Sequence, residues 1–359
     1  MNVEAAIEFF VRESYGQALA WLASIAQGDI AAAEDALSDG LLAALRQWPH
    51  EGVPKEPVAW LITAARRRLI DAQRREATRS KHADQLRVML DDPAPPPVTD
   101  ERLSLLFACT HPGVDEAARA PLMLQVVLGL DAERIASAFV VAPATMSQRL
   151  VRAKARIKDA GIRFAVPEAE HWPERMEFVL AAIYAAYTLG RAESPRDLTS
   201  EAIGLARVLV SLVPDDPEAR GLLSLCMHCE ARTAAQWQGG LYTPLPEQDM
   251  QLWDEELQAE AEQHLSLAAK AQRLGRYQLE AAIQSVHAAR RFTGDTRWSA
   301  IAGLYQGLLT LTSALGAQIG HAIAHGQVHG PGTGLSLLET IPFTAVEAHQ
   351  PWWAAKAEF

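Results

Sequence analysis

Apolar residues recur three and four positions apart along almost the whole 359-residue chain, and this spacing restricts its fold more than any other feature. An α-helix turns once every 3.6 residues, so this pattern places apolar side chains on one face of a helix. The strict alternation of polar and apolar residues that is typical of half-buried β-strands is not sustained in the sequence. We therefore expect an all-α protein.

Proline-rich segments divide this helical pattern. Residues 91–100 read DDPAPPPVTD, and a segment with so many prolines breaks a helix and favours an extended linker. A second break lies in residues 166–173, which read VPEAEHWP. We therefore predict four parts, which are a helical domain over 1–90, a linker over 91–100, a helical domain over 101–165 and a C-terminal helical domain over 166–359.

Beyond the second break, helix-like blocks alternate with proline or glycine. The blocks cover residues 174–190, 197–213, 216–233, 249–273, 277–290 and 297–315. Paired helices in series favour an α-hairpin or solenoid layer of the tetratricopeptide (TPR) kind, although no strict repeat of 34 residues is visible.

The net charge of −11 is unevenly distributed along the chain. Residues 1–166 hold 20 Lys and Arg against 21 Asp and Glu, whereas residues 167–359 hold 13 against 23. Within the first part, Arg66–Lys81 and Arg149–Arg163 are compact basic clusters. Two such clusters suit a two-point contact with a polyanion, and two solvated helix faces are the alternative.

The chain has three cysteines, which are too few for a secreted disulfide scaffold. The N-terminal residues MNVEAAIEFFVRESYG carry charges within their apolar stretch, unlike a signal peptide. No apolar run approaches the 18 or more residues expected of a membrane span. We predict a cytoplasmic protein without a membrane partner.

The first basic cluster lies in a segment whose helical phase can be worked out at 100° per residue. The residues on the apolar face are Val58, Leu61, Ile62, Ala65 and Leu69. The outward residues are Thr63, Arg67, Asp71 and Arg74, flanked by Arg66, Arg68 and Arg75. Guanidinium groups in such a stripe can donate paired hydrogen bonds to phosphates and to base edges. Trp60 either stacks on an unpaired base or packs in the core.

The second cluster follows helix-turn-helix spacing. Residues 130–154 predict a short helix, a turn of three or four residues, and a second helix opened by Pro143. The buried stripe of the second helix consists of Met146, Leu150, Ala153 and Ile157. The residues left to project are Thr145, Gln148, Arg149, Arg152 and Arg156, which are of the kind that read major-groove edges and neighbouring phosphates.

Three segments follow one another in a recognisable order: AEDALSD at 33–39, WLITAARRRLID at 60–71, and the helix-turn-helix residues up to Lys154. In order and spacing they resemble regions 2 and 4 of an extracytoplasmic-function (ECF) RNA polymerase sigma factor. LLFACTHP at 105–112, EQDMQLWD at 247–254 and YQLEAAIQSVH at 277–287 resemble a subgroup of that family with a C-terminal TPR-like extension.

The resemblance implies partners and contacts. Region 2 would bind core RNA polymerase and melt the −10 element of promoter DNA, and region 4 would bind the −35 element. The expected −10 residues are Trp60, Thr63, Arg66, Arg67, Arg74 and Arg75. The expected −35 residues are Thr145, Ser147, Gln148, Arg149, Arg152 and Arg156. The residues expected to contact polymerase are Glu34, Asp35 and Asp39. An equally good interpretation is that they are ordinary acidic residues near the N-terminus of a helix.

Two further points concern region 2 and the extension. The loop over 49–57 corresponds to the family's loop that captures a flipped −10 base. The family usually carries Asn at the position of Arg67, and the subgroup's Asn-Glu-Gly motif is replaced by Thr188-Leu-Gly190. The acidic C-terminal part either inhibits the DNA-binding parts through an intramolecular contact or serves as an activating platform, and we favour the platform.

We expect no enzyme activity, cofactor or metal, because the sequence contains no nucleotide-binding loop, nucleophile elbow or zinc-protease motif. His321, His325 and His329 would share one helix face, but glycines weaken that helix. Cys226 and Cys229 fit a core better than a metal site. Two interpretations remain open for a further group of residues, which either line a pocket or form a capped helix start with a packed Trp. The group is Asp249, Trp253, Asp254 and Tyr277. The alternative function is a helical protein that binds a ligand or another protein and has no promoter activity.

Overall fold

The structure is a computed structural model that describes residues 2–79, 100–139, 141–162, 164–193, 197–238, 241–347 and 349–359. The chain forms two compact units, Met1–Leu205 (the N-terminal unit) and Ala206–Phe359 (the C-terminal unit). The all-α prediction is confirmed, because the described residues are mostly helical and their sheet is a single two-stranded hairpin. Apart from Asp100, the predicted linker lies outside the described residues. No described helix is both long and apolar enough to cross a membrane.

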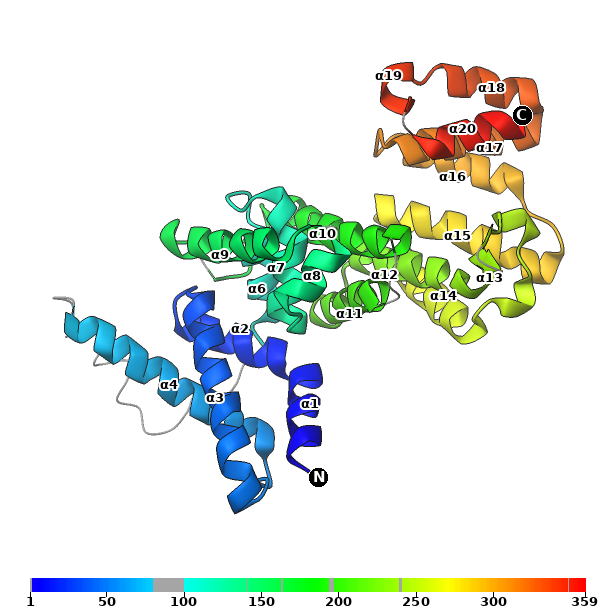
Figure 1. Ribbon diagram of the computed structural model, residues 1–359. Helices are drawn as coiled ribbons and strands as arrows, with labels where there is room; N and C mark the ends of the chain where they lie inside the picture. The colour runs from blue at the N-terminus through cyan, green and yellow to red at the C-terminus, as the bar shows by residue number, and fades with distance from the viewer. Residues whose placement is uncertain are drawn as a thin grey trace. The chain divides into compact units, whose positions relative to one another are not determined.

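The N-terminal unit contains two groups of helices (Figure 1). The first group is α1 (Val3–Glu13), α2 (Tyr15–Ile25), α3 (Ile30–Glu51) and α4 (Pro57–Arg79). The second group is α6 (Arg102–Cys109), α7 (Glu116–Leu128), α8 (Ala132–Ala138), α9 (Pro143–Asp159) and α10 (Trp172–Glu193). Helix α11 (Asp197–Leu212) crosses the boundary between the two units.

Aspartate side chains begin several of these helices by accepting hydrogen bonds from backbone N–H groups that lack a helical partner. Asp29 accepts from Ala32 N at 3.0 Å at the start of α3. Asp131 accepts from Arg134 N at 2.8 Å at the start of α8. Helix α9 begins instead with Pro143 in its first turn, where a missing N–H costs nothing.

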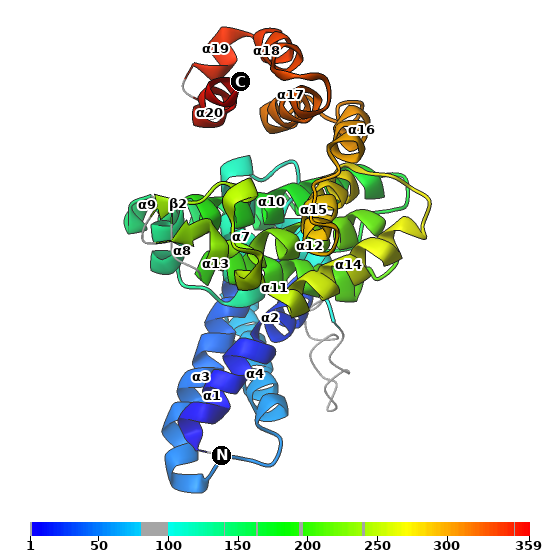
Figure 2. The ribbon, with the colours of Figure 1, turned by 90° about the vertical axis from the view of Figure 1, so that its right-hand side faces the viewer.

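The two groups of helices pack against each other through α2. Helix α2 contacts α6 and α7 as well as α3, and both views show α3 and α4 lying together (Figures 1 and 2). At Gly16 the backbones of α2 and α7 come so close that a Cβ atom would lie 2.1 Å from the carbonyl oxygen of Val127. Helix α10 follows the predicted break at 166–173 and packs on α6, α7 and α8.

The C-terminal unit is a series of helices in which α12 packs on both α14 and α15, and α15, α16, α17 and α18 pack one on the next. They are α12 (Pro217–Glu230), α13 (Thr233–Gln236), α14 (Glu255–Ala269), α15 (Arg276–Thr293), α16 (Trp298–Leu308), α17 (Leu315–His329), α18 (Pro331–Glu339), α19 (Phe343–Val346) and α20 (Gln350–Glu358). Strands β1 (Trp237–Gln238) and β2 (Leu241–Tyr242) form the hairpin, and two 3₁₀ turns, Leu245–Glu247 and Met250–Leu252, precede α14.

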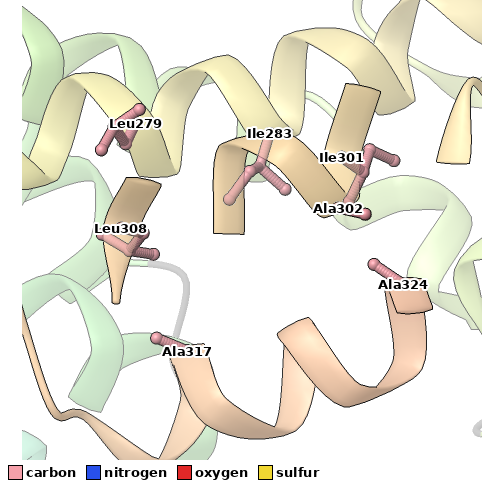
Figure 3. Close-up of a cluster of buried hydrophobic side chains, with 7 residues drawn as sticks. All are labelled: Leu279, Ile283, Ile301, Ala302, Leu308, Ala317 and Ala324. Atoms are coloured by element: carbon pink, nitrogen blue, oxygen red, sulfur yellow. The ribbon is translucent and has the colours of Figure 1, made fainter. Parts of the chain in front are cut away.

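Small buried clusters hold the helices of this series together. Figure 3 shows one cluster, to which α15 contributes Leu279 and Ile283, α16 contributes Ile301, Ala302 and Leu308, and α17 contributes Ala317 and Ala324. A second cluster connects α17 with the helices that follow it, and it includes Leu338 and Trp352. The helices from α15 onwards therefore bury their apolar residues in successive small clusters rather than in one central core.

Several predicted boundaries were wrong. The loop expected over 49–57 is shorter, because α3 continues through Pro49 and ends only at Gly52, whose φ is +85°. The block expected over 249–273 begins as a helix at Glu255, where Asp254 caps α14 by accepting from Leu257 N at 2.9 Å. The block over 297–315 ends at Leu308. Trp253 is buried, as expected of a capped helix start with a packed Trp.

We predict that Gly16→Ala destabilises the N-terminal unit by roughly 1–3 kcal/mol, since the added methyl group would force α2 away from α7. Urea unfolding measures the change. The matched control is Gly204→Ala within α11, where an added Cβ meets no atom within 4 Å, and it should leave stability unchanged or raise it by up to about 1 kcal/mol. Equal effects of both substitutions would contradict the close packing of α2 on α7.

Two histidines of the C-terminal unit should make its stability depend on pH. Burial, followed by the charge of Arg232, lowers the pKa of His228 to about 4, and burial followed by Arg232 and Arg290 lowers the pKa of His287 to about 4. An unfolded histidine titrates near 6.5, so the unfolded chain binds more protons between these values. Stability is therefore complete above pH 6.5 and falls as the pH drops towards 4, by up to about 3 kcal/mol for each histidine.

Urea unfolding at pH 7 and pH 5 checks this prediction. His228→Gln should reduce the loss of stability between the two pH values, because one buried histidine no longer has to be protonated on unfolding. His329→Gln changes an exposed histidine of the same unit and serves as the control. A wild-type loss that His228→Gln leaves unaltered would refute the assignment.

Candidate nucleic-acid interface

Helix α4 has the predicted phase. Leu61, Ile62, Ala65 and Leu69 are buried, and Val58 is half-buried. Arg67, Arg74 and Arg75 are exposed on the other side of the helix. The helix therefore presents arginines to solvent over several turns while its apolar stripe packs on α3.

A surface groove of about 720 Å³ lies between the start of α4, α3 and the connection that joins the two helices. Its lining includes Pro54, Lys55, Trp60, Thr63, Arg67 and Arg68. The structure thus brings together three of the residues expected to contact the −10 element, which are Trp60, Thr63 and Arg67. Cationic and aromatic side chains in one groove can bind a phosphate and stack on a base at the same time.

Trp60 is packed on one neighbour and remains partly accessible. Its ring meets that of Trp48 edge-on, with a centroid distance of 5.4 Å, and Trp48 is almost fully buried. Trp60 itself is only half-buried and lines the groove. Packing on Trp48 therefore holds the ring in place, so little side-chain entropy would be lost if a base stacked on its free surface.

The remaining arginines of α4 do not line this groove. Arg66 is half-buried, and its Nε is enclosed with no hydrogen-bond partner among the described residues. Arg75 donates from Nε to the carbonyl oxygen of Asp71 at 3.2 Å. Arg74 and Arg75 extend the exposed basic surface towards the end of α4, where they suit a phosphate backbone rather than a shaped pocket.

Helices α8 and α9 lie where the sequence predicts the two helices of a helix-turn-helix, and residues 139–142 separate them. The predicted stripe is confirmed, because Met146, Leu150, Ala153 and Ile157 are the buried residues of α9. Of the expected −35 residues, Thr145, Ser147, Gln148, Arg152 and Arg156 are exposed and Arg149 is half-buried.

Hydrogen bonds orient the arginines of α9. Arg152 donates to Gln148 Oε1 at 3.2 Å. Arg149 donates to the carbonyl oxygen of Ala117 at 3.4 Å, and Arg156 donates to that of Gly113 at 3.2 Å. Arg149 and Arg156 therefore lie close to the segment before and at the start of α7, while Gln148 and Arg152 lie together on the open face of the helix.

The sequence analysis missed two lysines of α9 that contact α3. Lys154 Nζ lies 2.5 Å from Glu34 Oε2, and both side chains are largely buried, with exposed fractions of 11% and 17%. Lys158 Nζ lies 2.7 Å from Asp29 Oδ2 in a more exposed pair. The two lysines lie one helical turn apart beside the buried stripe, and this position was the available signal for a contact with another helix.

The three acids expected to meet polymerase therefore differ in their surroundings. Asp35 and Asp39 are exposed. Glu34 pairs with Lys154, and burial raises the pKa of its carboxyl group although the lysine charge acts in the opposite direction. In this arrangement a polymerase surface could reach Asp35 and Asp39 directly, whereas Glu34 would first have to leave Lys154.

Among the described residues, no group of three or more His, Cys, Asp or Glu side chains is placed to hold a metal ion. His321, His325 and His329 do stack along α17, with ring centroids 4.3 Å and 5.4 Å apart. Cys226 is buried and Cys229 is half-buried on α12, as expected of residues in or beside a core.

Comparison with known proteins gives two family matches and one relative. Residues 10–79 match the family "Sigma-70 region 2", and residues 175–269 match "Family of unknown function (DUF6596)". The chain is 34% identical over 325 residues to the uncharacterized protein R00370 of Rhizobium meliloti (strain 1021), covering 86% of this chain and 77% of that protein. No solved structure matches the chain. The groove and the arginines of α4 up to Arg75 thus lie within a sigma-70 region 2.

We predict that Lys154→Gln destabilises the N-terminal unit by roughly 1–3 kcal/mol, because it leaves the largely buried Glu34 carboxylate without its cation. Lys158→Gln is the matched control. It removes the same charge from the more exposed pair with Asp29 and should cost no more than about 1 kcal/mol. Urea unfolding measures both changes, and equal losses would show that burial of the Glu34 pair has no energetic importance.

Proposed function

Because the chain belongs to the same protein family as the Rhizobium meliloti protein and carries a sigma-70 region 2, we propose that it is an alternative sigma factor of the ECF type. In this proposal it binds bacterial core RNA polymerase and directs promoter-specific initiation of transcription, without enzymatic activity of its own. Residues 1–90 and 101–165 act as sigma regions 2 and 4 joined by the linker 91–100, and residues 166–359 form a TPR-like domain that modulates activity.

The observation that carries the proposal is the groove that α3, α4 and their connection form within the sigma-70 region 2 match. Moving a base out of the DNA stack costs a few kcal/mol of stacking and pairing free energy. A groove with an aromatic side chain and nearby cations can offset this cost. Trp60, Thr63 and Arg67 supply these groups here. Arg66, Arg74 and Arg75 would contact the backbone beside the −10 element.

Helix α9 supports the second part of the proposal. Its exposed side carries Thr145, Ser147, Gln148 and Arg152, and a helix with such a face fits the DNA major groove. Arg149 and Arg156 would contact phosphates beside the −35 element. Asp35 and Asp39, with Glu34 once it is released from Lys154, would meet basic residues of polymerase.

Run-off transcription with core polymerase on a pool of genomic promoter fragments tests the proposal. We expect initiation at specific promoters that depends on the full chain. A helical protein without promoter activity, which is the alternative function, would give no initiation and no binding to core polymerase, and that result would refute the proposal.

Single substitutions on a selected promoter separate the two DNA contacts. Arg152→Ala should weaken promoter binding by roughly 1–3 kcal/mol if the side chain contacts a base. Arg67→Ala should leave that binding step in place and reduce open-complex formation, measured by reactivity of unpaired thymines. Arg12→Ala, which changes an exposed arginine of α1, is the control. A uniform loss for Arg152→Ala and Arg67→Ala on any DNA sequence would contradict the separate roles.

A further inference from the structure

Arg232 of the C-terminal unit is a buried cation that forms no ion pair within the described part of the chain. Only 5% of the residue is exposed. Its Nη2 donates to Gln284 Oε1 at 2.5 Å and lies 3.9 Å from Cys229 Sγ. Its Nε and Nη1 are buried with no hydrogen-bond partner among the described residues, and neither partner of its Nη2 is a carboxylate. An arginine cannot lose its charge at physiological pH, so this arrangement is costly unless something else compensates it.

A second arginine approaches the same aromatic ring. Arg232 and Arg290 have their guanidinium carbons 6.0 Å and 5.4 Å from the ring centroid of Trp253, which is 2% exposed. Arg290 donates from Nη2 to the carbonyl oxygen of Leu245 at 2.9 Å, and its Nε is buried without a partner in the described part of the chain. The indole nitrogen of Trp253 is likewise buried and has no hydrogen-bond partner among the described residues.

The two histidines beside this cluster supply no negative charge. Burial is the main cause that lowers the pKa of Arg290, and the charge of Arg232 adds to the effect. Burial, followed by the charge of Arg232, lowers the pKa of both His228 and His287, and this leaves them neutral at pH 7. Oε1 of Glu262 lies 3.4 Å from Nε2 of His228. The excess positive charge is notable in a chain segment, 167–359, that holds 23 acids against 13 bases.

The unpaired groups of this cluster share one chemical property. Arg232 Nε and Nη1, Arg290 Nε and Trp253 Nε1 are all hydrogen-bond donors, and neither arginine nor tryptophan can accept. A water molecule could satisfy some of these donors but would leave two positive charges uncompensated. An oxyanion supplies several acceptor atoms and negative charge together, which matches what the cluster lacks.

We propose that Arg232, Arg290 and Trp253 form a binding site for the carboxylate or phosphate group of a small molecule. Stacking on Trp253 holds both guanidinium groups, so their orientation is largely set before the ligand arrives. Arg290 is half-buried whereas Arg232 and Trp253 are buried, so we expect a ligand to enter beside Arg290. Arg232 and Trp253 lie within the segment that matches the family of unknown function, so the site gives that segment a ligand-binding role. The inference does not depend on the proposed sigma activity.

Thermal unfolding of the full chain at constant ionic strength tests the site. Inorganic phosphate, acetate and citrate are titrated separately against chloride, and the three series distinguish a phosphate from a carboxylate ligand. We expect at least one anion to raise the melting temperature of the C-terminal unit in a saturable way, because a ligand that binds only the folded state stabilises it. Isothermal titration with that anion should give one equivalent bound.

Arg232→Gln separates a binding residue from a merely structural one. In chloride alone the variant should melt at the same temperature as the wild type or higher, since an uncompensated buried charge has been removed, and the shift caused by the anion should be lost. A structural arginine would instead lower the melting temperature in every buffer and leave the anion shift intact. Arg207→Gln, which removes an exposed arginine paired with Glu260, is the control and should keep the full shift.

Two results would overturn the proposal. The first is a wild-type protein that no tested anion stabilises and that binds none in the calorimeter. The second is an anion shift that is equal in the wild type, Arg232→Gln and Arg207→Gln, because that pattern reflects a general salt effect. If Arg232→Gln does not fold, Arg290→Gln takes its place with the same expected loss of the anion shift.

Discussion

The close approach of α2 to α7 at Gly16 determines how the N-terminal unit is assembled. Any side chain at this position would push against the carbonyl group of Val127, so only glycine allows the contact. Helix α7 also contacts α6, α8, α9 and α10, while α2 contacts α1, α3 and α4. One backbone contact thus positions two groups of helices, and it brings Lys154 of α9 to Glu34 of α3. The groove beside α4 and the exposed face of α9 belong to the same compact unit for this reason.

The local parts of this structure could be predicted from the sequence. All four residues expected in the buried stripe of α9, from Met146 to Ile157, are buried, and α4 differs only at the half-buried Val58. Such stripes depend on the 3.6-residue period, which a sequence shows directly. The exposed faces that carry the candidate DNA contacts follow from the same period, because they are the sides left over. The starts of α3 at Asp29 and of α9 at Pro143 likewise depend on single residues with strong local preferences.

The parts that could not be predicted depend on residues far apart in the chain. Glu34 and Lys154 are 120 positions apart, and nothing local to either residue shows that they pair. Arg232 belongs to a residue type that is rarely buried, so its position near the end of α12 gave no sign that Gln284 and Trp253 would enclose it. The hairpin at Trp237–Tyr242 is too short for alternation to be visible. At Pro49 a strong local rule failed, because α3 continues through this residue to Glu51.

The pairing of Lys154 and Lys158 with acids of α3 has a consequence for how salt would act on promoter binding. DNA releases bound counterions in proportion to the number of phosphates that a protein neutralises, and the logarithm of affinity falls with the logarithm of salt concentration by about 0.9 for each phosphate. While the two lysines neutralise Glu34 and Asp29, the cations that α9 can offer to phosphates are Arg149, Arg152 and Arg156. Release of both lysines would steepen the slope by about 1.8. The salt dependence of promoter binding would therefore report whether α9 has separated from α3.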